Sequence, residues 1–253
     1  MSQSFRLSRI LDIARKDGRV SVDELASEFD VAVQTIRRDL TDLADAGKLE
    51  RVHGGAVLPS GVVNIGYEDR RNLNADAKQA IARLCGALIP NGASVFLNIG
   101  TTTEAVARAL LHHEGLLVVT NNMNVATILA ANQDVEIFLA GGRLRRSDGG
   151  LTGHQTIRTI EQFKFDIAVI GCSALDHDGD VLDFDIEEVS VSQTIIARSR
   201  QSILAADQSK FQRNAPARIT SLRQIDHFAT DAALSPDLTA DCQTWGTQPH
   251  IAE

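Results

Sequence analysis

The hydrophobic positions of the first 58 residues follow a helical period. Within residues 5–47, apolar side chains recur every three or four residues in three short segments. Gly18 and Gly47 follow the first and third segments, where a helix is expected to end. After them, two extended runs flank Gly54-Gly55, which is the pattern of a β-hairpin. Three helices followed by a hairpin predict a winged helix-turn-helix domain, mainly α, over residues 1–58.

The second of these helices is expected to begin with a capping box. Ser21 stands three residues before Glu24, so its hydroxyl is placed to accept from the Glu24 amide while the carboxylate reaches back. The third helix is expected to begin near Val33 and to bury Ile36 and Leu40 on one face.

From about residue 75 the pattern changes to helical stretches that alternate with short runs of β-branched residues. The predicted strands are Ser94–Leu97, Leu116–Val119, Val135–Leu139, Ile167–Ile170, Ser202–Ala205 and His227–Ala229. The predicted helices cover residues 75–89, 103–112, 122–131, 154–162 and 187–199. Apolar strands between helices indicate an α/β domain over residues 75–253, with a doubly wound parallel sheet. Residues 59–74 contain Gly, Pro and several Asn, and we expect them to form the linker.

Composition narrows the class of protein. The net charge is −8, but the first 58 residues hold nine Lys and Arg against ten Asp and Glu, so the acidity lies mostly in the larger part. No apolar run is long enough to cross a bilayer and the start lacks the apolar core of a secretory signal, so we expect a cytoplasmic protein. The three cysteines are scattered without CxxC spacing, which argues against a disulfide framework or a zinc site. We expect neither a metal nor a cofactor.

Small and polar residues follow several of the predicted strands. After residues 94–97, Gly100 and three threonines lead into a helix. Such a turn suits an anion, because hydroxyls and helix-start amides donate to it, although threonines that merely cap the helix would explain it nearly as well. Because a parallel sheet binds ligands beyond the carboxyl ends of its strands, several such turns on one edge predict a pocket. Lys210 would be its phosphate cation.

An acidic cluster precedes the helix at residues 187–199. It consists of Asp183, Asp185, Glu187 and Glu188. A carboxylate there either binds ligand hydroxyls or favours the helix start through the helix dipole, and the sequence leaves both interpretations open.

The first turns of the third helix carry the side chains that would read DNA. Gln34, Thr35, Arg37 and Arg38 stand there, and arginine pairs with guanine as glutamine does with adenine. Residues of the hairpin would hold phosphates. The full set that we expect at the DNA is Ser21, Gln34, Thr35, Arg37, Arg38, Lys48, Arg51, His53 and Gly54. The alternative is a winged-helix interaction module with surface arginines.

Two blocks of the N-terminal part, "TIRRDL" and "HGGA", resemble the DNA-binding domain of the DeoR family. The C-terminal part resembles the family's sensor domain through "IGTTTEA", "VVTNN", "LAGGRLR", "DQSKF" and "HFATD", in that order. The resemblance implies a transcriptional repressor that acts on double-stranded operator DNA, and we expect it to do so as a dimer or tetramer. It also implies a sensor with a sugar-phosphate-isomerase-like fold but no catalysis.

Within the family, stretches such as "IPNGASVFLNIGTTTEAVARALL" are most similar to members that control glycerol metabolism. The resemblance therefore implies glycerol-3-phosphate, or a related sugar phosphate, as the effector that releases the DNA. The residues that we expect to bind the effector are Gly100, Thr101, Thr102, Thr103, Asn121, Asn122, Gly141, Gly142, Gly150, Asp185, Glu187 and Lys210.

The chain departs from the family pattern at two places. Asn98 stands where the family usually has Asp, and Ser192-Gln193 stands where a basic pair is common. Another sugar phosphate as effector remains an alternative. So does an enzyme of sugar phosphates with an attached DNA-binding domain, although we find no nucleophile–base pair or metal set in the sequence.

Overall fold

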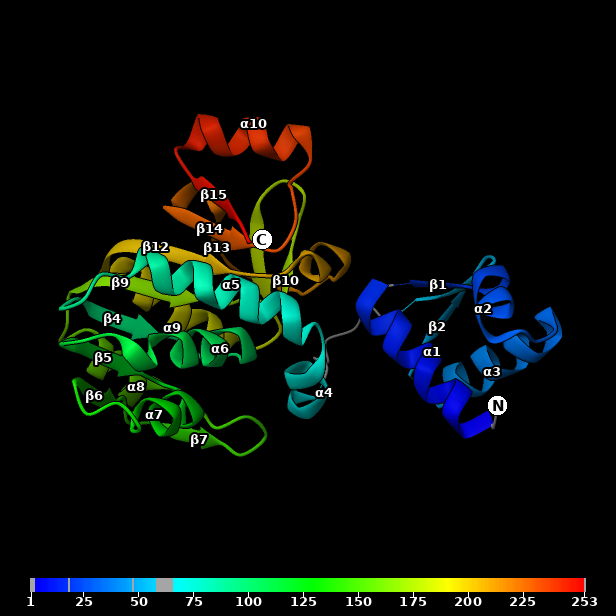
Figure 1. Cartoon of the computed structure of the whole chain (residues 1–253), viewed down its shortest axis with the longest axis horizontal. Coiled ribbons are helices and arrows are strands. Elements are labelled where there is room, and N and C mark those ends of the chain that lie inside the picture. Colours follow the sequence, from blue (N-terminus) through cyan, green and yellow to red (C-terminus); the bar gives the residue numbers. More distant parts are fainter. Residues whose placement is uncertain (1–2, 18, 47, 58–65, 253) are drawn as a thin grey trace. The chain divides into compact units, whose positions relative to one another are not determined.

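The computed structural model describes residues 3–17, 19–46, 48–57 and 66–252. The chain forms two compact units, residues 1–61 and 62–253, which are described separately below (Figure 1). The predicted linker, residues 59–74, falls partly outside the described residues, at 59–65. Its remainder contains helix α4 (Tyr67–Asn72), which belongs to the larger unit.

The N-terminal unit is a winged helix-turn-helix, as predicted. Its helices are α1 (Gln3–Asp17), α2 (Val22–Phe29) and α3 (Val33–Asp45). The wing is a small antiparallel sheet of β1 (Arg19–Ser21), β3 (Gly55–Val57) and β2 (Glu50–Val52), in that order. One apolar core joins the helices to the wing, with Ile10, Leu25, Ile36, Leu40 and Ala56 among its buried members.

One local feature of the wing differs from the sequence interpretation, and its glycine turn agrees with it. The predicted capping box is wrong, because Ser21 makes no side-chain capping hydrogen bond and pairs instead with Gly55 as the last residue of β1. Gly54 turns the hairpin with φ +79°, a conformation that favours glycine. At Gly55 a Cβ would lie 1.9 Å from the Val20 carbonyl oxygen, so this position requires glycine.

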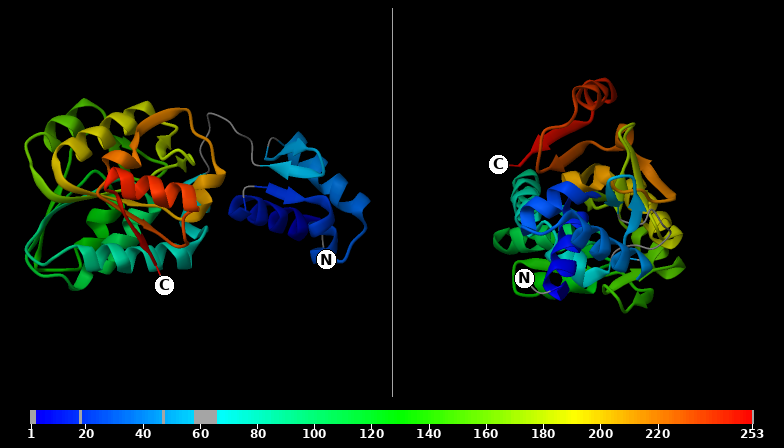
Figure 2. Two further views of the ribbon diagram at one scale, coloured as in Figure 1. Left: turned by 90° about the horizontal axis from the view of Figure 1, so that it is seen from above. Right: turned by 90° about the vertical axis from the view of Figure 1, so that its right-hand side faces the viewer.

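The larger unit is built on a seven-stranded parallel sheet (Figures 1 and 2). The strands, in spatial order, are β15 (Gln248–Ile251), β14 (His227–Thr230), β12 (Ser199–Ala205), β9 (Phe165–Ile170), β4 (Ser94–Leu97), β5 (Leu116–Thr120) and β6 (Val135–Leu139). The helices besides α4 are α5 (Ala75–Leu88), α6 (Thr101–Ala109), α7 (Met123–Leu129), α8 (His154–Ile160), α9 (Ile186–Ala197) and α10 (Pro236–Trp245). This arrangement confirms the predicted doubly wound α/β fold.

Alternate strand residues point to opposite faces of the sheet and bury two separate cores. Val95 and Leu97 pack with α5, α6 and α7, whereas Phe96 between them packs with α8, α9 and α10. A strand with both faces buried needs apolar side chains at every position, which is why the sequence pattern identified these strands.

Shorter elements surround the main sheet. They are the hairpin β7 (Arg143–Arg145) and β8 (Gly150–Thr152), the antiparallel sheet of β10 (Ala174–Leu175), β11 (Asp180–Asp183) and β13 (Ala217–Ser221), and the 3₁₀ turns η1 (Leu110–His112), η2 (Gln208–Gln212) and η3 (Leu222–Gln224). The sequence analysis placed η1 inside its predicted helix over residues 103–112 and missed the others, together with α4, α10 and β15. In the described part of the chain, every helix lacks the long apolar run that a membrane span requires.

The order of the strands fixes where a ligand can bind. From β4 the chain moves through β5 to β6 on one side, then returns to β9 on the other side and continues to β12. The connections that leave β4 and β9 therefore diverge, which opens a crevice beyond their carboxyl ends.

Candidate functional site

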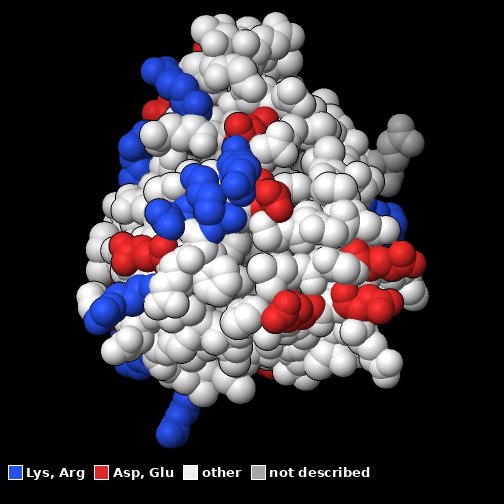
Figure 3. Space-filling model, turned by 90° about the vertical axis from the view of Figure 1, so that its left-hand side faces the viewer, with Lys and Arg blue, Asp and Glu red and all other residues white. Residues whose placement is uncertain are grey.

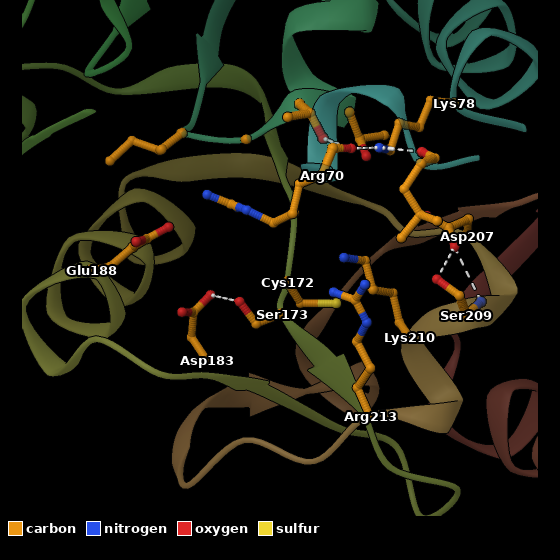
Figure 4. A pocket seen from close by; sticks show the side chains of 16 residues that line it. Arg70, Lys78, Cys172, Ser173, Asp183, Glu188, Asp207, Ser209, Lys210 and Arg213 are labelled. Carbon is orange, nitrogen blue, oxygen red and sulfur yellow. Dashed lines mark hydrogen bonds between the residues drawn. The ribbon is translucent and has the colours of Figure 1, made fainter. Parts of the chain in front are cut away.

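A pocket lies at this crevice, beyond the carboxyl ends of β4, β9 and β12 (Figure 4). Its volume is about 520 Å³ when the space open to solvent is included. The lining residues are Arg70, Leu73, Lys78, Ile99, Gly100, Thr101, Thr102, Gly171, Cys172, Ser173, Asp183, Glu188, Asp207, Ser209, Lys210 and Arg213. We call this cavity the strand-end pocket.

Four basic side chains from three regions of the chain meet in the strand-end pocket. Arg70 comes from α4, Lys78 from α5, and Lys210 and Arg213 from η2 and the residue that follows it (Figure 4). Burial, together with the mutual repulsion of these cations, lowers the pKa of Lys78 to about 8. Burial and the charge of Arg213 likewise lower the pKa of Lys210. Each cation would be stabilised by an anion placed among them.

Two of these cations have unused donors. The Nε atoms of Arg70 and Arg213 are buried and have no hydrogen-bond partner among the described residues. Buried donors of this kind are rare in proteins and are costly to leave without an acceptor. A multivalent oxyanion such as a phosphate would supply acceptors to both.

The turn from β4 into α6 forms another wall of the pocket. Gly100 adopts φ +149°, and Thr101 and Thr102 begin the helix. The Thr103 hydroxyl holds the turn from behind, because it lies 2.7 Å from the Asn98 carbonyl oxygen and 2.8 Å from that of Gly100. The start of α6 therefore belongs to the pocket lining, and an anion is stabilised at such a helix start.

Three carboxyl groups complete the lining. Burial alone would raise the pKa of Asp207, but Lys210 and the hydrogen bond from Ser209 hold it below its ordinary value.

The other two carboxyl groups, Asp183 and Glu188, lie away from Lys210 and Arg213 (Figure 4). Burial, and then the charge of Asp183, raise the pKa of Glu188 to about 7. Burial likewise raises the pKa of Asp183, which accepts from Ser173 at 3.1 Å. Such groups can exchange hydrogen bonds with ligand hydroxyls.

Of the twelve residues predicted to bind the effector, four line the strand-end pocket: Gly100, Thr101, Thr102 and Lys210. The other eight lie outside its lining. One of them, Thr103, holds the turn between β4 and α6 through its hydroxyl group. The sheet order explains most of the rest, since the turns after β5 and β6 lie on the side of β4 that faces away from β9. Those turns carry Asn121, Asn122, Gly141 and Gly142.

These outlying residues have structural partners of their own. The Asn122 side chain caps α7 by accepting from Asn124 N at 2.9 Å. Gly150 packs on Ile99 so closely that a Cβ would lie 2.7 Å from its side chain. Asn121 donates to the Leu151 carbonyl at 3.1 Å, and the Gly141 carbonyl accepts from Thr156 at 2.7 Å. Gly142 takes φ +147° beside the same threonine.

The acidic cluster before α9 divides between two roles. Asp185 caps α9 by accepting from Glu187 N at 2.9 Å, as the helix-start interpretation expects. Glu187 lies 2.6 Å from Arg143. The two members of the cluster that line the pocket are Asp183 and Glu188. Asp185 and Glu187, which are the two that the sequence analysis expects at the effector, lie outside the lining of this pocket.

Sequence reasoning also missed Arg70, Lys78, Arg213 and the segment Gly171–Ser173. The last of these carried a usable signal, because small and polar residues follow a predicted strand there as they do after β4. The basic residues carried none, since single Lys and Arg residues on helices or in loops usually lie at the surface.

The N-terminal unit presents the side chains predicted to meet DNA. On α3, Gln34, Arg37 and Arg38 are exposed, and Thr35 is half-buried. In the wing, Lys48, Arg51, His53 and Gly54 are exposed, whereas Ser21 is half-buried. Arg51 donates to the Arg37 carbonyl at 3.3 Å, which connects the wing to α3. The face of the larger unit that is drawn in Figure 3 is largely uncharged, and its basic side chains lie beside acidic ones.

Comparison with known proteins matches both units. Residues 6–62 match the DeoR-like helix-turn-helix domain, and residues 73–232 match the DeoR C terminal sensor domain. The chain is 46% identical to the glycerol-3-phosphate regulon repressor of Escherichia coli (strain K12) over 232 residues, which is 92% of each chain. It is also 46% identical to the protein of the same name from Haemophilus influenzae, over 91% of this chain and 90% of that one.

Among solved structures, ribose 5 phosphate isomerase A from Neisseria gonorrhoeae shows a loose likeness. The TM-score is 0.40 with 14% identity, over 53% of this chain and 52% of the isomerase. The two domain matches and the full-length relatives lead to one conclusion: the chain belongs to the DeoR family of helix-turn-helix transcriptional regulators.

Proposed function

We propose that this protein is a transcriptional repressor of genes for glycerol or glycerol-3-phosphate metabolism, and that glycerol-3-phosphate in the strand-end pocket releases it from operator DNA. The main support for a phosphorylated effector is that four basic side chains meet in one cavity. Two of them have buried nitrogen donors without a hydrogen-bond partner among the described residues. The names of the relatives from E. coli and H. influenzae support the same choice.

The chemistry of the pocket agrees with a small phosphate ester that carries hydroxyls. A phosphate monoester has a charge near −2 at neutral pH, since its second pKa is about 6. Arg213, Lys210 and the start of α6 offer it donors and positive charge. Asp183 and Glu188 lie at the part of the pocket away from Lys210 and Arg213, where they can hold hydroxyl groups.

DNA binding and effector binding must be linked for release to occur. We expect a dimer or tetramer in the cytoplasm that holds two α3 helices at the spacing of two operator half-sites. An effector that favours an arrangement with misplaced helices weakens DNA binding. By reciprocity, DNA then weakens effector binding by the same factor.

The test is a titration of the full chain on labelled candidate operators at fixed salt. We expect glycerol-3-phosphate to release the DNA, while glycerol and hexose or amino-sugar phosphates leave it bound. If DNA binds and a different sugar phosphate releases it, glycerol-3-phosphate is the wrong effector within the right family. Failure to bind any candidate operator would overturn the proposal.

One observation favours a second candidate function, that of an enzyme acting on sugar phosphates. Glu188, with a pKa raised to about 7 by burial and by Asp183, has the property of a general acid or base. In the proposed repressor it only holds a hydroxyl. Incubation of the purified protein with sugar phosphates distinguishes the repressor from the enzyme. We expect the wild type to convert no more sugar phosphate than a Glu188→Gln variant does.

A further inference from the structure

Helix α4 belongs to neither of the matched domains. The helix-turn-helix match ends at residue 62 and the sensor match begins at residue 73, whereas α4 covers Tyr67–Asn72. It is the first helix described after the wing, and its Arg70 lines the strand-end pocket. Along the chain, the first described helix after the DNA-binding unit therefore contributes to the ligand site.

The guanidinium group of Arg70 is poorly paired within the protein. Its Nη2 lies 3.4 Å from Asp148 Oδ2, and its Nε has no partner among the described residues although it is buried. Asp148 is already held by Arg145, whose Nε and Nη2 lie 2.9 Å and 2.7 Å from the two carboxylate oxygens. Arg145 thus leaves Arg70 with one long contact. An anion in the pocket would give Arg70 the acceptor that it lacks.

The end of α4 is fastened to other residues of the pocket through its backbone. Lys78 Nζ donates to the carbonyl oxygen of Arg70 and, at 2.6 Å, to that of Leu73. The Thr101 hydroxyl lies 3.4 Å from the Arg70 carbonyl oxygen. Side chains from the start of α6 and from α5 therefore contact both the pocket and α4.

The beginning of α4 is held by Tyr67. Its hydroxyl lies 3.0 Å and 3.2 Å from the two carboxylate oxygens of Glu104, and it accepts from Asn124 Nδ2 at 3.1 Å. The same Asn124 amide lies 3.0 Å from the Asp148 carbonyl oxygen. Both ends of α4 thus reach the segment around Asp148, which is where Arg70 has its long contact.

We propose that Arg70 binds the anionic group of the effector and that this contact fixes α4, so that α4 transmits occupancy of the pocket to the DNA-binding unit. The proposal rests on the proposed function for the identity of the effector and for its effect on DNA. Among the described residues, the ion-pair partner of the Arg70 guanidinium is Asp148, and a bound anion would add a second partner. The states with and without the anion therefore differ in the contacts of α4, which a switching element requires.

The first experiment compares three variants of the full chain: Arg70→Met, Lys210→Met and Arg71→Met. Lys210 lines the same pocket but stands on η2, and Arg71 is the exposed next residue of α4 outside the pocket lining. Affinity for glycerol-3-phosphate and for inorganic phosphate is measured by calorimetry. Operator affinity is measured without ligand and with each variant saturated by ligand.

The expected results separate binding from transmission. Arg70→Met should bind both ligands roughly 10- to 100-fold more weakly, as for a lost hydrogen bond to a charged group. It should also keep the operator when saturated. Lys210→Met should bind as weakly but release the operator fully at saturation, and Arg71→Met should match the wild type in both. An Arg70→Lys variant should recover part of the affinity, because it keeps the charge without the fork.

A second readout uses a property of the sequence. Tyr67 is the only tyrosine of the chain, so ring-labelled tyrosine gives one NMR signal, and that signal reports on α4. It should shift when phosphate or glycerol-3-phosphate is added to the wild type or to Lys210→Met at saturation. It should stay unchanged in saturated Arg70→Met. The wild-type arm needs no folded variant, and an unshifted Tyr67 signal there would refute the proposal.

The outcomes distinguish this proposal from the proposed function. If Arg70→Met binds ligand and releases DNA like the wild type, Arg70 has neither role. If it binds weakly but releases fully at saturation, Arg70 is a pocket cation only and transmission through α4 is wrong. If glycerol-3-phosphate has no effect on wild-type DNA binding, the proposed function fails, while phosphate affinity and the Tyr67 signal still decide whether Arg70 and α4 respond to an anion. A wild type that binds neither ligand overturns both.

Discussion

Asn98 and Ser192 are hydrogen-bonded to each other inside the sensor unit. Asn98 Nδ2 donates to Ser192 Oγ across 2.9 Å, and the two residues are only 2% and 1% exposed. Both belong to the two places where the sequence analysis expects the chain to depart from the family pattern. Since they touch, we expect the two departures to form one change, in which a neutral pair replaces an acidic and a basic residue. Neither lines the strand-end pocket.

This contact predicts a coupled effect of substitution. Asn98→Asp alone places a carboxylate in the interior without a cation and should lower the free energy of unfolding by roughly 2 kcal/mol or more. Adding Ser192→Lys should recover part of that loss, which a double-mutant cycle in denaturant measures. Additive effects of the two substitutions would show that the positions are independent.

Arg37 and Arg38 should affect DNA binding in different ways. A side chain that reads a base, when changed to Met, should weaken operator binding by about 1–3 kcal/mol and leave non-specific binding nearly unchanged. One that holds a phosphate should weaken both alike and reduce the salt slope by about 1. Titrations at several salt concentrations make the assignment, with Arg158→Met on the exposed side of α8 as the control. If both variants bind the operator as tightly as the wild type does, α3 is not part of the interface with DNA.

Ligand affinity should fall as the pH rises above 8. Burial, and then the charge of Lys210, lower the pKa of Lys78 to about 8, and a bound anion must raise that pKa. Lys78 is therefore charged below pH 8 and supports binding there, and it loses its proton as the pH rises through 8 unless ligand is bound. The phosphate charge is constant between pH 7.5 and 9.5, since its second pKa is about 6. Calorimetry across this range should show a smaller fall for Lys78→Met; an identical fall would assign the pH dependence to another group.

Asp39 should stabilise the N-terminal unit through Arg6. Arg6 Nε lies 2.5 Å from Asp39 Oδ2 and its Nη2 lies 3.1 Å from Oδ1, which joins α1 to α3 beneath the exposed arginines. Asp39→Ala should cost about 2 kcal/mol, between the values for surface and deeply buried pairs, because solvent lies close in so small a unit. Hydrogen exchange of the α1 and α3 amides measures this locally. Glu28→Ala, which breaks a 3.9 Å exposed contact with Arg9, should change little.

The parts of the fold that could be predicted are those in which one residue pattern has one structural meaning. β4 and β9 are apolar at every fully buried position because both faces are covered, and α3 is apolar on a single stripe. β15 was missed because it lies at the edge of the sheet, contains a proline and has no fully buried residue. β11 was missed because acidic residues stand at both of its ends.

The site was less predictable than the fold, for a topological reason. The sequence showed that turns after strands carry polar residues, but it contained no information on which strands are neighbours. In chain order β5 and β6 follow β4, so Asn121 and Gly141 were placed with Gly100. In space, β9 is the neighbour of β4 on the other side, and the cavity opens there. The cations Arg70 and Arg213 come from segments whose approach to this cavity depends on tertiary packing alone.

The placement of β9 beside β4 also determines when a newly made chain becomes able to respond to its effector. Pairing of Val95 with Ile167 joins segments that are far apart in the sequence, and the last cation of the pocket, Arg213, follows later still. Synthesis proceeds from the N-terminus, so the DNA-reading helix α3 leaves the ribosome long before the pocket can exist. A nascent or truncated chain that ends before Arg213 would carry the operator-reading part without a complete sensor. We expect such a fragment to contain α3 but to lack a pocket that could bind the effector.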